Sequence, residues 1–334
     1  MTSPRDNTLS DRDAMRVTQF GHPPTPVREP MPKRNDRNAL IRVTHASIGV
    51  TDTGAAQGDY LLQPVRGFVP GYDFVGVIEQ LPSVTQSQLR VGQRIAGVLP
   101  RMGAHASVIS VAPSLLVPVP DSLDSATAAT VPLDAVTAWF ALDALALTRG
   151  TVLVQGAGGA VGSWAAQLAT EQGLTVYGTA SSRSRAYAGQ FTTSLVDYHD
   201  PNWITQIIEA TNGGVDGAID HTGSSSIRRA VRQTGGVVRT AFGGAPGHQR
   251  SATASGFLTS ALLRYARPRE RICSVPIIVA TRRAEYRDAL TKLFAAVSRG
   301  ELVPPRPRIV SPTDYAQAFA ANIANPGEKM VLER

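Results

Sequence analysis

The sequence predicts a two-domain α/β protein, in which a β-rich, barrel-like domain precedes a doubly wound parallel sheet. Short apolar runs separated by Gly and Pro fill residues 15–120, a pattern typical of a partly open barrel. From residue 151 onward, strand-like and helix-like segments alternate, which predicts a parallel sheet with helices on both faces. The chain has 334 residues, 43% of them hydrophobic, which is enough for two such cores.

A glycine-rich turn is the most informative segment. Residues 151–154 read as a strand, 163–172 as an amphipathic helix and 174–179 as a second strand. The turn reads Ala157-x-Gly159-x-x-Gly162, with Ala in the first Gly position. Such a Rossmann-type unit binds the pyrophosphate of a dinucleotide, because the helix N-terminus offers backbone N–H groups and partial positive charge. The alternative is a structural Gly-rich turn in another α/β domain. The expected cofactor-binding residues here are Gly156, Ala157, Gly158, Gly159, Ala160, Val161 and Gly162.

The residues after the second strand distinguish two nicotinamide cofactors. A site for NAD usually has an acidic residue about 20 residues past the glycines, but Ala180 and Ser181 stand there and basic residues follow. Hydroxyl and guanidinium groups suit a 2′-phosphate. We therefore expect NADPH, with Arg183 as the first phosphate ligand, Arg185 as the second, and Ser181 and Ser182 beside them. The alternative is a solvated basic start of a helix.

The formal net charge of +7 permits a nucleic-acid partner, but the pattern argues against one. Basic residues are scattered along the chain and only 6% of residues are aromatic, too few for a base-stacking surface. A basic balance also suits an anionic cofactor. The sequence shows no run long enough for a membrane span and no signal-peptide pattern, so we expect a cytoplasmic protein. The single cysteine, Cys273, excludes an intrachain disulfide.

Patterning predicts the remaining elements. Residues 1–14 are polar and are expected to form a disordered tail. A Pro-rich surface loop is expected over 23–32, and a small-residue loop of the kind that covers a cofactor over 244–254. Strands are expected at 15–20, 39–48, 69–78, 91–97, 105–111, 194–198, 215–220, 236–242, 273–279 and 329–332, and helices at 124–147 with a break at Pro132, 202–211, 225–232, 257–266, 283–299 and 314–325.

Together these segments resemble the medium-chain dehydrogenase/reductase superfamily, in its zinc-free, quinone oxidoreductase-like branch. The matching runs are VPGYDFVGVI at 69–78, VGQRIA at 91–96, VPLDAVTA at 131–138, residues 152–169, VDGAID at 215–220 and GEKMVL at 327–332. The resemblance implies a GroES-like catalytic domain from residues 15–120 and 276–334, and a Rossmann NADPH-binding domain over 121–275. It also implies an active site in the cleft between them and a homodimer.

The residues argue against a metal site. Zinc-dependent relatives take ligands from an early Cys, a His in a Gly-His-Glu turn and a later Cys. Here residues 49–53 lack Cys, the turn reads Gly71-Tyr72-Asp73, and Cys273 lies far downstream, whereas zinc needs about four ligands. We therefore expect no metal. Hydride transfer then requires an acceptor that is already electrophilic, such as a quinone or an α,β-unsaturated carbonyl.

The resemblance also assigns residues to the cleft. Thr137 matches a threonine beneath the nicotinamide, and Tyr60 matches a tyrosine near the substrate; both are expected to be catalytic. A phenol can donate a hydrogen bond to a quinone oxygen, although Tyr60 can also be a half-buried packing residue. Tyr72 replaces the zinc-binding His and is expected in the substrate site.

Three further residues complete the expected cofactor site. Tyr198 matches a tyrosine that contacts the 2′-phosphoadenosine ribose in relatives; the alternative is a strand-end tyrosine. Thr222 and Gly243 follow the expected strands at 215–220 and 236–242, where the carboxyl ends of parallel strands meet the ligand.

Two departures from the relatives affect the substrate. Gly49 stands where many relatives carry Asn, and Gly54 where many carry Tyr, while Asp52 is retained. Loss of two polar side chains widens the expected pocket and favours a bulky acceptor. Three functions follow in order of preference: an NADPH-dependent quinone or enone reductase, an enoyl reductase tailoring a bulky polyketide-like intermediate, and a non-enzymatic NADPH- or nucleic-acid-binding protein, supported only by the charge of +7.

Overall fold

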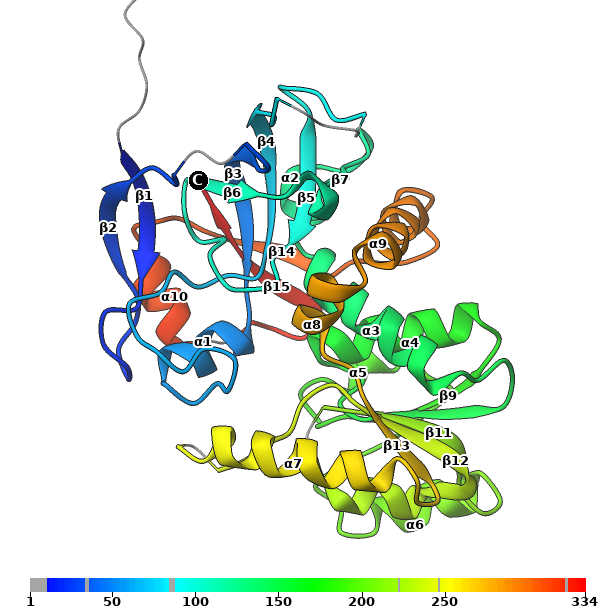
Figure 1. The fold of residues 1–334 in the computed structure, drawn as a ribbon. Coiled ribbons are helices and arrows are strands. Elements are labelled where there is room, and N and C mark those ends of the chain that lie inside the picture. The colour runs from blue at the N-terminus through cyan, green and yellow to red at the C-terminus, as the bar shows by residue number, and fades with distance from the viewer. Residues whose placement is uncertain (1–10, 34–35, 84–87, 222, 246, 322–323) are drawn as a thin grey trace, which may run out of the picture.

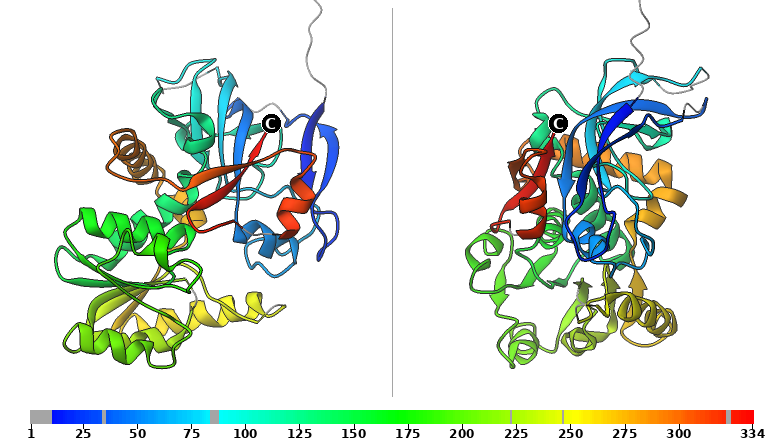
Figure 2. Two further views of the ribbon diagram at one scale, coloured as in Figure 1. Left: turned by 180° about the vertical axis from the view of Figure 1, so that it is seen from behind. Right: turned by 90° about the vertical axis from the view of Figure 1, so that its left-hand side faces the viewer.

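The computed structural model describes residues 11–33, 36–83, 88–221, 223–245, 247–321 and 324–334. The chain forms two domains, and helices α8 (Val275–Thr281) and α9 (Arg283–Ser298) lie near their junction (Figure 1). Figure 2 shows that the C-terminal segments, in orange and red, lie in the same domain as the N-terminal strands, in blue. The predicted pairing of a barrel-like domain with a parallel-sheet domain is confirmed.

The first domain is built on a mixed sheet that takes strands from both ends of the chain. Its order is β14-β15-β3-β4-β5-β7, and β6 also pairs with β3. Helices α1 (Val50–Ala56), α2 (Ser125–Ala128) and α10 (Tyr315–Ala321) accompany it. The strands are β3 (Ala39–Ile48), β4 (Asp73–Gln80), β5 (Arg94–Val98), β6 (Val108–Val111), β7 (Val117–Pro118), β14 (Arg306–Val310) and β15 (Glu328–Glu333).

An N-terminal hairpin replaces two predicted irregular segments. Strands β1 (Asp11–Arg16) and β2 (Thr25–Pro30) pair antiparallel, so residues 11–14 are not part of a disordered tail and the loop predicted over 23–32 is largely strand. Residues 1–10 lie outside the described part. Arg12 and Arg16 of β1 both contact the Glu29 carboxylate across the pair, and Ala14 and Met15 are buried. The charged residues of β1 that pair across the hairpin therefore made this strand resemble a polar tail in the sequence.

The second domain is a parallel sheet with the order β10-β9-β8-β11-β12-β13. All of its strand pairs are parallel, and this order, in which the first strand lies centrally, is that of a dinucleotide-binding sheet. The strands are β8 (Thr151–Val154), β9 (Thr175–Thr179), β10 (Ser194–Val196), β11 (Val215–Asp220), β12 (Val231–Arg239) and β13 (Arg269–Ile272), and the helices are α3 (Pro132–Leu145), α4 (Ala160–Glu171), α5 (Arg185–Ala188), α6 (Trp203–Ala210) and α7 (Gln249–Leu263).

Predicted elements from 124 to 220 agree with the structure to within a few residues, but several later ones were wrong. Residues 225–230 form a 3₁₀ helix, β12 begins at Val231, and α7 begins at Gln249 rather than at 257. The strand expected at 273–279 is replaced by β13 before it and α8 after Ser274. The charged sequence RERI of β13 did not predict a strand, because it does not show that Glu270 is buried against Arg239. Pro276 lies near the start of α8, a position that suits a helix N-terminus.

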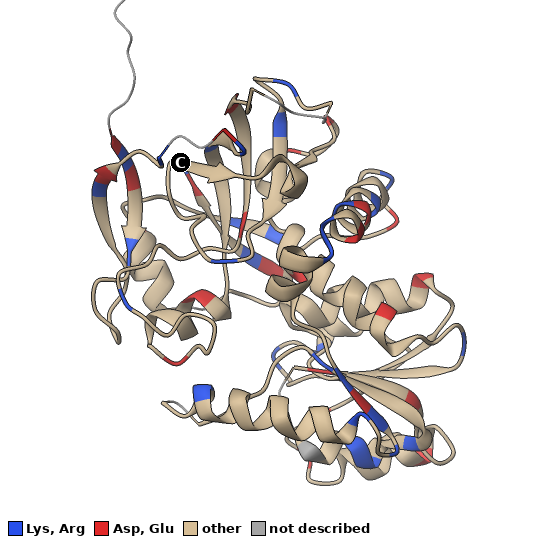
Figure 3. Ribbon diagram, in the orientation of Figure 1, with Lys and Arg blue, Asp and Glu red and all other residues tan. Residues whose placement is uncertain are grey.

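One continuous hydrophobic core joins the two domains. Phe74 of β4, Trp164 of α4 and Leu290 of α9 are all buried within it, so the two halves of the structure pack as a unit. Acidic and basic residues are interspersed over both domains (Figure 3), in agreement with the scattered charges of the sequence. Across the described ranges, no helix is both long and apolar enough to cross a membrane.

Candidate active site

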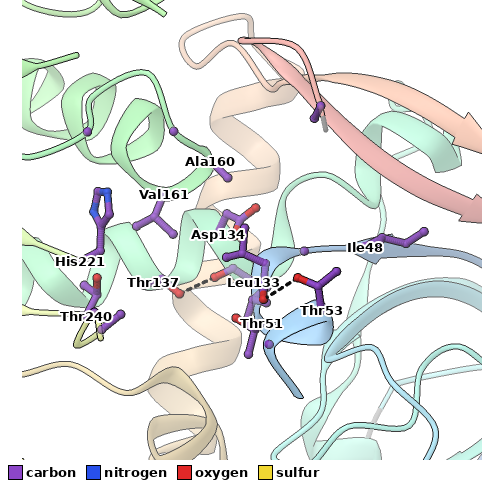
Figure 4. Close-up of a pocket in the computed structure, with 18 of the residues that line it drawn as sticks. Ile48, Thr51, Thr53, Leu133, Asp134, Thr137, Ala160, Val161, His221 and Thr240 are labelled. Carbon is purple, nitrogen blue, oxygen red and sulfur yellow. Dashed lines mark hydrogen bonds between the residues drawn. The ribbon is translucent and has the colours of Figure 1, made fainter. Parts of the chain in front are cut away.

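A cleft of about 1370 Å³ runs between the two domains. From the first domain it is lined by α1, by the segment around Tyr60 and by the start of β15. From the second it is lined by the turn after β8 and by the starts of α3 and α4 (Figure 4), and also by the loop before α7. The cleft therefore lies at the carboxyl ends of the parallel strands, where open α/β sheets bind their ligands.

The glycine turn lies against the first turn of α4, as an anion site requires. Backbone N–H groups in the first turn of a helix have no intrahelical acceptor, and Ala160 and Val161, the first two residues of α4, line the cleft. A Cβ on Gly162 would lie 2.2 Å from the carbonyl oxygen of Gly156, so the turn can approach the helix only with glycine there. Gly156 itself has a φ of 64°, which favours glycine.

The predicted residues of this turn divide into two groups. Ala157 and Gly162 do not line the cleft: Ala157 is fully buried and donates its N–H to the Thr179 carbonyl at 2.8 Å. They shape the turn rather than face a ligand. The members that line the cleft are Gly156, Gly158, Gly159, Ala160 and Val161.

The residues predicted to bind the 2′-phosphate likewise divide into those that line the cleft and those that do not. Ser181 and Arg183 line the cleft, whereas Ser182 and Arg185 do not. The Arg183 guanidinium is exposed and donates to the Ala324 carbonyl at 2.9 Å. The Arg185 guanidinium donates to the Leu195 carbonyl at 3.4 Å. Arg183 is therefore the better placed of the two arginines.

The other predicted cofactor residues follow the same edge of the sheet. Tyr198 and Gly243 line the cleft, and Tyr198 is 43% exposed, so its phenol is accessible. Thr222 lies outside the described residues. Its neighbour His221 lines the cleft beside Gly156, since a Cβ on that glycine would lie 2.6 Å from the imidazole Nε2. The sequence prediction missed His221, which follows β11 directly.

Two tyrosines meet on the substrate side. The hydroxyl oxygens of Tyr60 and Tyr72 lie 3.1 Å apart, and their rings pack edge to face at a centroid distance of 6.3 Å. Both residues line the cleft, as predicted. Burial raises the pKa of both phenols above the usual value. The phenols are therefore protonated at neutral pH, and one of them has its proton available for a ligand.

Thr137 lies in α3 and lines the cleft (Figure 4). Its hydroxyl donates to the Leu133 carbonyl one turn earlier, at 2.7 Å. The hydroxyl proton is thus engaged by the helix, and the oxygen keeps its capacity to accept a hydrogen bond. This arrangement suits a positioning contact with an amide N–H better than proton donation.

A buried charge cluster next to this wall was missed by the sequence prediction. The Lys329 ammonium donates to the Asp134 carboxylate at 2.6 Å, and both residues line the cleft. The carboxyls of Asp52 and Asp73 lie close enough to shift the pKa of Lys329. The sequence signal was present but weak: Asp134 is the one charged residue in the run VPLDAVTA, and Lys329 follows Glu328 in the run GEKMVL. We expected Gly49 to leave this part of the pocket without a polar side chain. However, a Cβ on Gly49 would lie 3.4 Å from the Lys329 Nζ, so the buried ammonium group of Lys329 lies beside the glycine.

Asp52 and Asp73 hold the backbone around the cleft. The Asp52 carboxylate accepts the N–H groups of Gly49 at 2.9 Å and Gly71 at 2.8 Å. That of Asp73 accepts the Ser47 hydroxyl at 2.6 Å and the Leu133 N–H at 3.0 Å. Burial raises the pKa of each carboxyl to about 6, although these donors and Lys329 act against it.

The donor set does not fit a zinc ion. Among the described residues, no group of three His, Cys, Asp or Glu side chains could hold a metal. Cys273 lines the cleft but is 3% exposed, and burial raises the pKa of its thiol to about 12, so it is not a ready thiolate ligand. Tyr72, which stands where zinc-dependent relatives have a His ligand, offers a protonated phenol instead.

Comparisons with known families agree with this geometry. The family "Alcohol dehydrogenase GroES-like domain" matches residues 35–121, and the family "Zinc-binding dehydrogenase" matches residues 160–268. The chain belongs to the medium-chain dehydrogenase/reductase superfamily, and is of its quinone oxidoreductase-like type. For a superfamily member with a Rossmann domain, this implies a nicotinamide cofactor, and the glycine turn fits one.

Among relatives of this dehydrogenase/reductase, the trans-enoyl reductase caaB of Aspergillus niger is 32% identical over 216 residues, which is 57% of this chain and 58% of that protein. A quinone oxidoreductase of Pongo abelii is 33% identical over 174 residues, 50% of this chain and 52% of that one. The match thus spans about half of the length of these relatives. The solved structure of the quinone oxidoreductase from Coxiella burnetii is 22% identical, with a TM-score of 0.80 over 97% of this chain and 99% of that one, and shares the fold.

Proposed function

We propose that the protein reduces a quinone or an α,β-unsaturated carbonyl compound with NADPH, without a metal ion. The observation that carries this proposal is the composition of one cleft. It combines an anion-binding helix N-terminus at Ala160 and Val161 with the protonated Tyr60–Tyr72 pair on the substrate side. A reductase needs both functions, a cofactor site and hydrogen-bond donors for an acceptor oxygen, within the same cavity.

NADPH is favoured over NADH by the residues after β9. Ala180 and Ser181 occupy the place where an acidic residue would bind a ribose 2′-hydroxyl. Arg183 lines the cleft nearby and is exposed, and a guanidinium group binds phosphate with two parallel hydrogen bonds. Tyr198 offers an accessible aromatic ring at the same end.

When bound, NADPH supplies the hydride. The chain would supply position and polarity: the first turn of α4 would hold the pyrophosphate through backbone N–H groups, and the Thr137 oxygen would accept a hydrogen bond from the nicotinamide amide. The Tyr60–Tyr72 pair donates to the acceptor oxygen. Because the donor set does not fit zinc, the acceptor must already be electrophilic, as a quinone or an enone is.

A second candidate is the reduction of a bulky enoyl intermediate. A Cβ built on Gly54 meets no atom of the described residues within 4 Å, and the cleft volume of about 1370 Å³ leaves room beyond a cofactor. The trans-enoyl reductase relative is consistent with this substrate class. Both candidates use the same chemistry and differ only in the size of the acceptor.

The experiment is a spectrophotometric panel that follows oxidation of the reduced cofactor. NADPH and NADH are each tested against simple quinones, small enones and large polyketide-like enones. Faster turnover with NADPH than with NADH, and with any of these acceptors, supports the proposal, while a preference for large enones selects the second candidate. Absence of turnover with every acceptor contradicts the proposed reduction. Equal turnover with NADH contradicts the preference for NADPH. That the protein acts as a homodimer in the cytoplasm stays a prediction.

A further inference from the structure

The ion pair between Lys329 and Asp134 lies on the wall of the cleft, apart from the Tyr60–Tyr72 hydrogen bond. Lys329 belongs to β15 of the first domain and Asp134 to the first turn of α3 of the second. Their side chains are 7% and 8% exposed, and Nζ lies 2.6 Å from Oδ2. Removing two charges from water costs several kcal/mol, so a buried pair is weak evidence for a stabilising role. Its place on the cleft wall suggests a functional one.

The ammonium group occupies space that Gly49 leaves open. A Cβ on Gly49 would lie 3.4 Å from the Lys329 Nζ and 3.8 Å from the Asp52 carboxylate. Any larger side chain at residue 49 would therefore compete with the ammonium for this position. Gly49 also lines the cleft, so the amino group lies beside the substrate side of the cavity.

Geometry separates the members of the charge cluster that a ligand can reach. Asp52 and Asp73 do not line the cleft, and each uses both carboxylate oxygens to accept protein donors. Glu328, the chain neighbour of Lys329, contacts Arg306 and the side chain of Asn325 instead. Lys329 and Asp134 thus remain for a ligand.

The ammonium has donors to spare. Lys carries three N–H donors, and within the described parts of the chain its one hydrogen-bond acceptor is Asp134. Two N–H groups are therefore available to an acceptor that enters the cleft. Burial acts to lower the pKa of Lys329, but Asp134 and two further carboxyl groups outweigh it and raise this pKa above the usual value. The amino group is consequently charged at neutral pH.

We propose that the Lys329 ammonium binds the carbonyl oxygen of the acceptor and donates the proton that completes its reduction, with Asp134 as the positioning residue. This inference rests on the proposed function. Hydride addition forms a C–H bond at the β-carbon of the enone and moves the π electrons onto the carbonyl oxygen. The ammonium stabilises this oxyanion and transfers a proton to it. The resulting amine regains a proton from water, and the enol becomes the ketone.

The same step serves a quinone. Two electrons arrive with the hydride, the ring becomes a hydroquinone monoanion, and Lys329 protonates its oxygen. The Tyr60–Tyr72 pair then orients the acceptor, and Lys329 supplies the positive charge where negative charge develops. A preorganised donor of this kind contributes a factor of about 100 to 1,000 in kcat.

The main variant removes both charges together. In Lys329→Met/Asp134→Leu, side chains of similar volume replace the pair, an exchange that in other proteins has preserved or improved folding, and Asp52 and Asp73 keep their own hydrogen-bond donors. We expect kcat at saturating NADPH to fall about 100- to 1,000-fold, while the Kd for NADPH measured by fluorescence stays within a few-fold of wild type. Lys292→Met is the matched control, because Lys292 forms a surface pair with Asp288 at 2.8 Å. It should leave kcat unchanged.

A binding measurement avoids reliance on turnover. 4-Nitrophenol is an oxyanion mimic whose visible absorbance reports its ionisation. In the wild-type holoenzyme it should bind as the phenolate, and in the double variant as the neutral phenol. Should the apolar pair fail to fold, Lys329→Gln/Asp134→Asn keeps a hydrogen bond and tests the same loss of charge.

Asp134→Asn tests the positioning role. It retains Lys329 but removes the carboxylate that helps to keep the amine protonated, so the alkaline limb of the kcat profile should move to lower pH. Asp52 and Asp73 still face the ammonium in this variant, so part of the effect remains. A purely structural role would lower stability without moving that limb.

The outcomes are distinguishable. A double variant with wild-type kcat, or one that still binds nitrophenolate, overturns the role of Lys329 but leaves the proposed function intact. A large rise in the Kd for NADPH with kcat preserved at saturation also overturns it, and places the ammonium at the cofactor phosphates. A wild-type protein that reduces no acceptor overturns the proposed function, and this inference with it.

Discussion

Asp59 of the first domain accepts the backbone N–H of Gly247 in the second, with Oδ2 2.7 Å from the nitrogen. Its other oxygen accepts the N–H of Arg250 at 3.2 Å, in the first turn of α7. Asp59 is buried, and both Asp59 and Gly247 line the cleft. One carboxylate thus ties the segment before α7 to the first domain, at the place where the sequence predicted a loop over the cofactor.

Asp59→Ala should loosen this connection and speed the release of NADPH. Hydrogen bonds to a charged group contribute about 1.5–3 kcal/mol each, so the dissociation rate measured by stopped-flow fluorescence should rise about 10- to 100-fold. Trypsin should also cleave faster at Arg250. Asp121→Ala, at an exposed aspartate, is the control and should match wild type. An Asp59→Ala protein with wild-type release and cleavage rates would rule out a restraining role.

Arg183→Ala should weaken NADPH far more than NADH. Arg183 lines the cleft and Arg185, two residues on, does not, so the two arginines form a matched pair. Loss of a charge-assisted contact to the 2′-phosphate should raise the KM for NADPH about 10-fold or more, with the KM for NADH nearly constant. Arg185→Ala should change neither value. Equal effects of both variants would remove the assignment of the phosphate site.

Local chemistry made the glycine turn of the proposed cofactor site visible in the sequence. The unit from β8 through α4 to β9 lies within about 30 consecutive residues, and its glycines have backbone reasons that the sequence shows directly. Gly156 needs its positive φ, and Gly162 its missing side chain. Such requirements act between near neighbours, so a pattern in one segment suffices to find them.

The cleft wall around Lys329 was less predictable because its contacts are distant in sequence. Lys329 and Asp134 are 195 residues apart, and nothing in either segment indicates the other. The start of α7 was missed for a different reason. This helix is rich in Ser, Ala and Gly and exposes Leu258 and Leu262, so it lacks the apolar stripe by which amphipathic helices are recognised.

Gly162→Ala should destabilise the turn on which the cofactor site depends. The added Cβ would lie 2.2 Å from the Gly156 carbonyl oxygen, so the turn must move, at a cost of about 1–3 kcal/mol in the free energy of unfolding. NADPH affinity should fall as well. Gly236→Ala is the control, since its Cβ meets neighbouring atoms at an ordinary 3.6 Å. Urea unfolding and NADPH titration measure both effects, and an unaffected Gly162→Ala protein would show that the turn tolerates a side chain.

Buried Asp73 should make the protein less stable as the pH rises from about 4 to 6. Burial raises the pKa of Asp73 from 3.8 to about 6. In this window the folded protein keeps a proton that the unfolded chain has lost, so the free energy of unfolding decreases with pH, by about 3 kcal/mol for a shift of this size. Asp52 acts in the same direction. Glu270 acts oppositely but at lower pH, since its arginine partners outweigh burial and lower its pKa to about 2.

Asp73→Asn removes one of these titrations while an amide oxygen still accepts a donor. Urea unfolding at a series of pH values should give a flatter dependence between pH 4 and 6 than in wild type, because the folded and unfolded variants bind the same number of protons at this residue. Asp121→Asn, at an exposed aspartate, should retain the wild-type slope. If the Asp73→Asn slope is equally steep, the Asp73 carboxyl keeps no extra proton in the folded protein over this range, and the raised pKa assigned to it is wrong.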